Sequence, residues 1–164
     1  MKHFLLMLLA LPTLLASASL IAQPEYVTIE MEIDVAKPAD EVWAAVGGYC
    51  GITDWMGLDC EYTSGDGDMG TVRALLGGRI IEIMVAQTPL SYGYTQPWNE
   101  GEFYNLYHGF MEARPVSANS SKLLYTLILD VSNLEDQAAK DADAAGRRAT
   151  FEGALASMKA LAEG

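Results

Sequence analysis

Few side chains in this sequence could carry out acid–base chemistry. His108 is one of two histidines, and the other, His3, lies in an N-terminal segment that we expect to be removed. A Ser-His-Asp triad would need His108, yet the chain has no G-x-S-x-G segment to supply the nucleophile. The alternation around His108 favours a structural or exposed histidine, with a general acid or base role as the alternative. We therefore assign no catalytic residue from the sequence.

Metal and cofactor sites are equally poorly supported. A single histidine excludes a multi-histidine metal site. The turn Asp66-Gly67-Asp68 has the residue types of a calcium loop, but an EF-hand starting at Asp66 needs a glutamate where this chain has Gly77. We interpret the segment as an ordinary turn, and we expect neither a metal nor a cofactor.

A second group of residues could hold a ligand rather than react with it. Aromatic side chains can line an apolar pocket and offer a hydroxyl or indole N–H at a fixed place. Each could equally be plain core, and Glu82, which alternates with Ile81 and Ile83, could equally face solvent. Inside a pocket, Glu82 could serve as a base for enolisation or aldol-type cyclisation. The candidate ligand-binding residues are Trp55, Glu82, Tyr92, Tyr94, Trp98, Tyr107 and Met111.

The two cysteines, Cys50 and Cys60, are separated by nine residues. An oxidising compartment would favour a disulfide between them. Such a bridge would tie the turn around Trp55 to the next strand and contribute about 2–3 kcal/mol through loop entropy. Two separately buried thiols are the alternative, whereas the spacing excludes a C-x-x-C redox pair.

Residues 1–22 resemble a secretory signal peptide. A basic start is followed by an apolar run over 4–15 and by Ala16-Ser17-Ala18, small residues at the spacing that signal peptidases recognise. We expect cleavage after Ala18, or alternatively after Ala22. An uncleaved anchor is disfavoured because a membrane span needs roughly 20 apolar residues. We therefore expect an exported protein, periplasmic or secreted, with no membrane span.

The charge balance limits the partners. The chain carries 22 acidic and 10 basic residues, a formal net charge of −12. Such a surface repels nucleic-acid backbones and anionic lipid, so nucleic-acid binding is disfavoured. A protein partner would be basic, although the acids could simply keep an exported protein soluble.

The elements that must position these residues begin with a strand. Apolar and polar residues alternate over 27–35, which predicts one buried and one exposed face. Pro38 then stops the strand and suits the start of a helix, with Asp40 and Glu41 in its first turn. Gly47-Gly48 ends that helix, and 52–55 could form only one further turn.

The remaining chain predicts more strands and one long helix. Expected strands cover 60–63, 71–76, 79–87, 91–98, 103–114 and 122–131, giving about seven with the first, in sequential antiparallel order. We expect Ile81, Ile83 and Val85 to share one face. The alanine-rich tail over 134–162 predicts an amphipathic helix with Arg147 and Arg148 exposed. We expect packing to explain Gly146 and Gly153, with close approach of a ligand to the helix backbone as the alternative. The predicted apolar stripe of this helix is Ala138, Ala142, Ala145, Ala149, Leu155, Met158 and Leu161.

Several segments together resemble a known superfamily. They are AKPADEVWAAVGGYCGITDW, DCEY, GDGDMGTVRALL, RIIEIMVAQTPLSYGY and FEGALASMKALAEG. They resemble the START-like, Bet v 1-like helix-grip group, which includes polyketide cyclases, aromatases and lipid-transfer domains. The resemblance implies an α+β domain over 23–164. In it, a curved antiparallel sheet of about six to seven strands wraps around the long C-terminal helix, two short helices follow the first strand, and a cavity is enclosed.

The resemblance implies a cavity but no common catalytic motif. We therefore expect an exported, non-catalytic protein that binds an apolar or amphipathic small molecule. One alternative is an enzyme of the polyketide cyclase or aromatase kind. Another is an interaction protein, because the exported pattern is similar to that of a periplasmic accessory protein of methanol oxidation. In that case the partner would be a basic redox protein.

Overall fold

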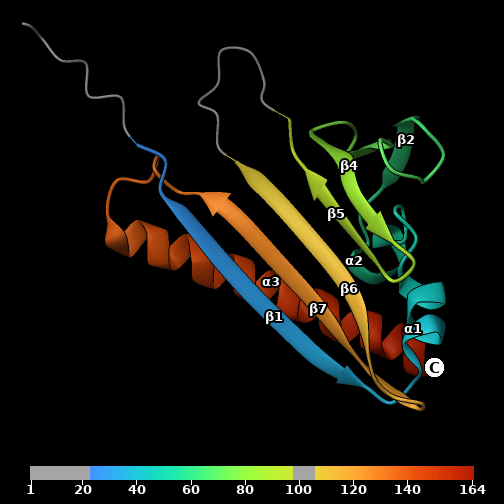
Figure 1. The fold of residues 1–164 in the computed structure, drawn as a ribbon. Coiled ribbons are helices and arrows are strands. Elements are labelled where there is room, and N and C mark those ends of the chain that lie inside the picture. Colours follow the sequence, from blue (N-terminus) through green and yellow to red (C-terminus); the bar gives the residue numbers. More distant parts are fainter. Residues whose placement is uncertain (1–22, 98–105) are drawn as a thin grey trace, which may run out of the picture.

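The computed structural model describes residues 23–97 and 106–164 (Figure 1). The predicted signal peptide, Trp98 and the first residues of the strand expected over 103–114 lie outside the described residues. Within the described chain, seven strands form one antiparallel sheet and a long helix packs along it. The predicted helix-grip architecture is confirmed.

The sheet order is β1-β7-β6-β5-β4-β3-β2. Its strands are β1 (Tyr26–Val35), β2 (Cys60–Ser64), β3 (Val72–Leu75), β4 (Ile80–Thr88), β5 (Ser91–Thr95), β6 (Tyr107–Ser117) and β7 (Ser120–Asp130). The predicted sequential order holds from β2 to β7 but is wrong for β1. That strand pairs with β7, with Met31 opposite Tyr125, because two helices carry the chain from β1 to the far edge of the sheet.

Those two helices are α1 (Ala39–Val46) and α2 (Ile52–Met56). Pro38 precedes α1, and Asp40 and Glu41 lie in its first turn, where carboxylates interact favourably with the helix dipole. Gly57 ends α2 with φ +69°, a left-handed conformation that suits glycine. Both helices pack their apolar residues into the core beneath the sheet.

Helix α3 (Gln137–Glu163) begins at Asp136, whose carboxylate accepts a 2.8 Å hydrogen bond from the Ala139 N–H. In Figure 1 it runs along the sheet, where it contacts β1 and β7. The predicted stripe is wrong in the first half of the helix, where its alanines are exposed, and Leu161 is exposed as well. An alanine-rich helix lacks a single distinctive apolar face, so the larger side chains determine the register. The residues that are buried are Phe151, Ala154, Leu155 and Met158.

In strand β4, Ile81, Ile83 and Val85 share one face as predicted, and Glu82 takes the inner position that the sequence left open. Glu82 and Met84 are buried on the inner face, whereas Val85 is 45% exposed on the outer face. The inner position of Glu82 is possible because Arg73 lies directly opposite on β3 and neutralises its charge. No helix in the described part of the chain is both long and apolar enough to cross a membrane.

Candidate functional site

A cavity of about 580 Å³ lies between the sheet, α2 and the first half of α3. This volume falls within the usual range of small-molecule sites. Its apolar wall consists of Ile52, Met56, Leu58, Leu75, Ile80, Leu106, Leu129, Val131, Leu134 and Phe151. The polar and aromatic lining consists of Glu82, Tyr94, Gln96, Tyr107, Asp130, Asn133, Asp143, Arg147 and Thr150.

The structure separates the predicted ligand-binding residues into two groups. Glu82, Tyr94 and Tyr107 line the cavity. Trp55, Tyr92 and Met111 are almost completely buried in the surrounding core and are not among the lining residues. Trp98 lies outside the described residues.

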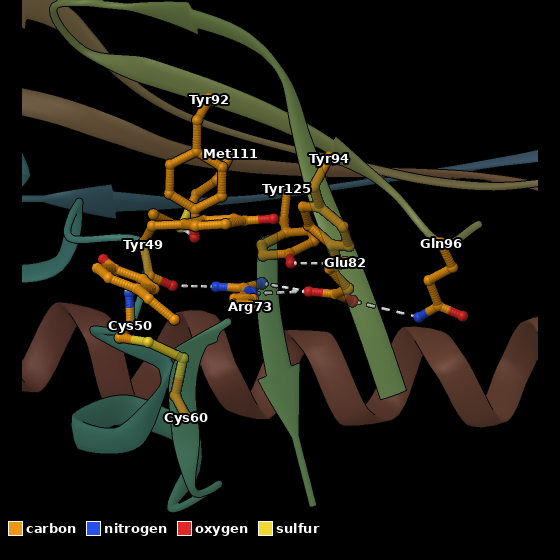
Figure 2. Close-up of polar contacts among 11 residues, drawn as sticks. Tyr49, Cys50, Cys60, Arg73, Glu82, Tyr92, Tyr94, Gln96, Met111 and Tyr125 are labelled. Carbon is orange, nitrogen blue, oxygen red and sulfur yellow. Dashed lines mark hydrogen bonds and ion pairs between the residues drawn. A yellow bond between two sulfur atoms is a disulfide. The ribbon is translucent and has the colours of Figure 1, made fainter. Parts of the chain in front are cut away.

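A buried ion pair anchors one wall of the cavity. The Glu82 Oε2 atom accepts hydrogen bonds from Arg73 Nε at 2.8 Å and from Arg73 Nη2 at 2.5 Å (Figure 2). Arg73 Nη1 donates to the Tyr49 carbonyl oxygen, and Gln96 Nε2 donates to Glu82 Oε1 at 3.2 Å. Both carboxylate oxygens of Glu82 are therefore engaged, which holds the side chain in place.

Three tyrosine rings surround the Arg73 guanidinium. Its Cζ atom lies 4.1 Å from the ring centroid of Tyr49, 5.1 Å from that of Tyr94 and 6.0 Å from that of Tyr92. Burial disfavours the charge on Arg73, but attraction to Tyr92 and Glu82 outweighs burial, so the pKa of Arg73 lies above its ordinary value. Arg73 is thus a permanent cation behind the cavity wall.

Arg73 was not among the predicted site residues, although the sequence carries a signal for its position. Gly77-Gly78 predicts a tight hairpin, and Arg73 and Glu82 are equidistant from that turn, so they must lie opposite one another. An arginine opposite a glutamate indicates an ion pair. Alternation alone could not show that the pair faces inward.

The tyrosines of the site act as neutral hydrogen-bonding groups. The Tyr94 and Tyr125 hydroxyls are 2.8 Å apart in the core. Burial raises the pKa of Tyr107 to about 12 and the pKa values of Tyr94 and Tyr125 well above their ordinary value. All three phenols therefore remain protonated near neutral pH.

Arg147 was predicted to face solvent, but it lines the cavity. Its Nε donates a 2.7 Å hydrogen bond to Asp143 one turn earlier on α3. Its guanidinium lies 5.5 Å from the ring centroid of Tyr107. The chain therefore places a half-exposed cation at the cavity wall, on the helix face that the alanine pattern failed to identify.

His108 lies apart from these groups. The centroid of its ring lies 6.2 Å from the ring centroid of Phe110, and Phe110 points to the outer face of the sheet. His108 is not among the residues that line the cavity. In the described ranges 23–97 and 106–164, no cluster of three or more His, Cys, Asp or Glu side chains could hold a metal ion.

The disulfide between Cys50 and Cys60 is confirmed. It joins the segment between α1 and α2 to the start of β2, and its neighbour Tyr49 supplies the carbonyl that accepts from Arg73 (Figure 2). The crosslink therefore braces the segment that holds one end of the ion pair.

Comparison with known proteins decides the family. A sequence profile described as polyketide cyclase / dehydrase and lipid transport matches residues 26–163. The chain belongs to this family. The matched region extends from β1 to the end of α3, so it includes every element that encloses the cavity. No individual curated protein matches by sequence.

Several solved structures share the fold of this family member. Zhui aromatase/cyclase from Streptomyces sp. R1128 is 18% identical with a TM-score of 0.64, covering 85% of this chain and 94% of that one. Norcoclaurine synthase from Thalictrum flavum, solved with dopamine and hydroxybenzaldehyde, is 17% identical with a TM-score of 0.59, covering 89% and 94%. Ara h 8.0201 is 14% identical with a TM-score of 0.61, covering 84% and 98%. At these identities the similarity shows a common fold.

Proposed function

We propose that this family member is an exported, non-catalytic protein that binds an apolar or amphipathic small molecule in its cavity. The observation that carries the proposal is the cavity of about 580 Å³, whose wall is largely aliphatic and aromatic with a few fixed polar groups. An apolar wall gives affinity through burial, and fixed polar groups orient the ligand. The family description, which includes lipid transport, is consistent with such a ligand.

The state of the polar groups favours binding over catalysis. Glu82, the candidate base, has both carboxylate oxygens engaged by Arg73 and Gln96. The phenol of Tyr107 has a pKa of about 12, raised by burial, so it is a weak acid at neutral pH. These groups are better suited to holding a ligand than to exchanging protons with it.

Two features support the proposed export. Residues 1–22 have the pattern of a secretory signal peptide. The Cys50–Cys60 disulfide is of the kind that persists in oxidising compartments such as the periplasm.

Ile80 and Ile81 provide a matched test of the cavity. Ile80 lines the cavity, whereas Ile81 alternates to the other face of β4. We expect Ile80→Trp to weaken binding of the neutral fluorescent probe N-phenyl-1-naphthylamine by about tenfold or more, because the indole occupies part of the ligand volume. Ile81→Trp should leave the affinity within about twofold. Fluorescence titration measures the affinity of each variant for the probe.

Thermal unfolding of the two variants checks that each is folded. Equal weakening of probe binding by both substitutions would place the ligand outside the cavity and contradict the proposal. Undetectable probe binding by the wild-type protein would do the same.

A further inference from the structure

A groove of about 410 Å³ adjoins the cavity along α3. It is lined by Ala142, Asp143, Gly146, Arg147, Thr150 and Phe151. Four of these residues, Asp143, Arg147, Thr150 and Phe151, also line the cavity. The groove and the cavity therefore share a wall formed by one stretch of α3.

Gly146 opens this groove. A Cβ atom built at Gly146 would meet no atom within 4 Å, and its φ is not in the left-handed region, so neither packing nor backbone conformation requires glycine here. The packing explanation expected from the sequence is thus wrong for Gly146, and it is wrong for Gly153 for the same reason. Glycine lowers helix stability relative to alanine, so its presence in the groove calls for another reason. Gly153 lies outside the groove lining.

Arg147 is a lining cation whose side chain contacts Asp143 and hydrogen-bonds to Tyr107 but has guanidinium N–H groups that no carboxylate of the described residues accepts from. Among the described residues, its side chain donates to a carboxylate only from Nε, which leaves Nη1 and Nη2 without an acceptor of that kind. The carboxylates of the lining are already engaged. Glu82 is paired with Arg73, Asp143 with Arg147, and Asp130 accepts from the Ser132 N–H at 2.9 Å.

We propose that the cavity and the groove form one binding site for an amphipathic molecule with an acidic head group, which Arg147 binds. This inference rests on the proposed function. The apolar part of the ligand lies in the cavity, and its carboxylate accepts two hydrogen bonds from Nη1 and Nη2 of Arg147, a bidentate geometry that suits guanidinium and carboxylate groups. Asp143 is a positioning residue that orients the guanidinium through Nε, and Gly146 leaves room for the head group.

The test compares three probes with the same chain and different heads: decanoate, 1-decanol and decylamine. Each competes with N-phenyl-1-naphthylamine for the full-length mature protein. We expect the wild-type protein to bind decanoate about tenfold more tightly than 1-decanol. Arg147→Gln should remove that preference and leave the affinity for 1-decanol within about twofold. Arg148→Gln is the matched control, because the neighbouring Arg148 is exposed and lines neither the cavity nor the groove.

A second pair of variants tests the groove. Gly146→Leu should lower the affinity for decanoate by about fivefold or more. Gly153→Leu lies on the same helix but outside the groove, and it should leave the affinity for decanoate unchanged. Equal affinities of the wild-type protein for acid and alcohol, or tighter binding of decylamine, would overturn the head-group assignment alone. If none of the three probes displaced N-phenyl-1-naphthylamine, both the head-group assignment and the proposed function would be contradicted.

Discussion

Replacing Glu82 with leucine is expected to lower the free energy of unfolding by about 3–5 kcal/mol. The substitution leaves the fully buried guanidinium of Arg73 without its counter-charge, and Gln96 loses its acceptor. A buried charge that has lost its partner keeps the whole cost of leaving water. Urea unfolding followed by circular dichroism at neutral pH measures the change.

Two variants make this prediction specific. The double variant Arg73→Met/Glu82→Leu should recover most of the lost stability, because apolar side chains of similar size can replace a buried ion pair at little cost. Glu112→Gln breaks the exposed pair with Arg114 and should change stability by less than about 1 kcal/mol. A single variant Glu82→Leu as stable as the wild type would contradict the buried ion pair.

Replacing Phe151 with alanine is expected to lower the free energy of unfolding by about 3 kcal/mol. The Phe151 ring is 9% exposed, lies 4.6 Å from the Tyr125 ring between their centroids, and forms part of the cavity wall. Its removal takes away contacts between α3 and the sheet and leaves the cavity larger. Thermal and urea unfolding measure the first effect.

The larger cavity gives Phe151→Ala a second readout. In a series of straight-chain alcohols, affinity should rise with each methylene, worth about 0.8 kcal/mol, until the cavity is full. We expect the limiting chain length to be greater in Phe151→Ala than in the wild type. Leu161→Ala is the control, since Leu161 is 46% exposed on the same helix and lies outside the cavity lining. The same limit in both proteins would show that Phe151 does not bound the ligand site.

The elements of the fold could be predicted because their signals are local. Alternation in β1, the proline and acidic residues that begin α1, and the Gly77-Gly78 turn each depend on a few neighbouring residues. The pairing of β1 with β7 could not be predicted in this way. It joins the two ends of the domain, and only the closed arrangement of the whole sheet determines it.

The site was harder to predict because its residues break local rules. Glu82 occupies an inner position where an apolar side chain is usual, and its cross-strand partner Arg73 makes that position favourable. Arg147 faces the cavity because the large side chain of Phe151 fixes the rotation of α3, which alanines at many positions leave undetermined. Both cases depend on contacts between elements distant in the sequence.

Native mass spectrometry of the protein purified from the cell that makes it tests the central claim most directly. The proposed function predicts a chain that is shortened at Ala18 or Ala22 and two hydrogens lighter because of the Cys50–Cys60 disulfide. It also predicts one small apolar or amphipathic molecule that is bound to the native protein and lost on denaturation. A chain that carries no small molecule, under conditions in which a known lipid-binding protein keeps its ligand, would contradict the proposed function.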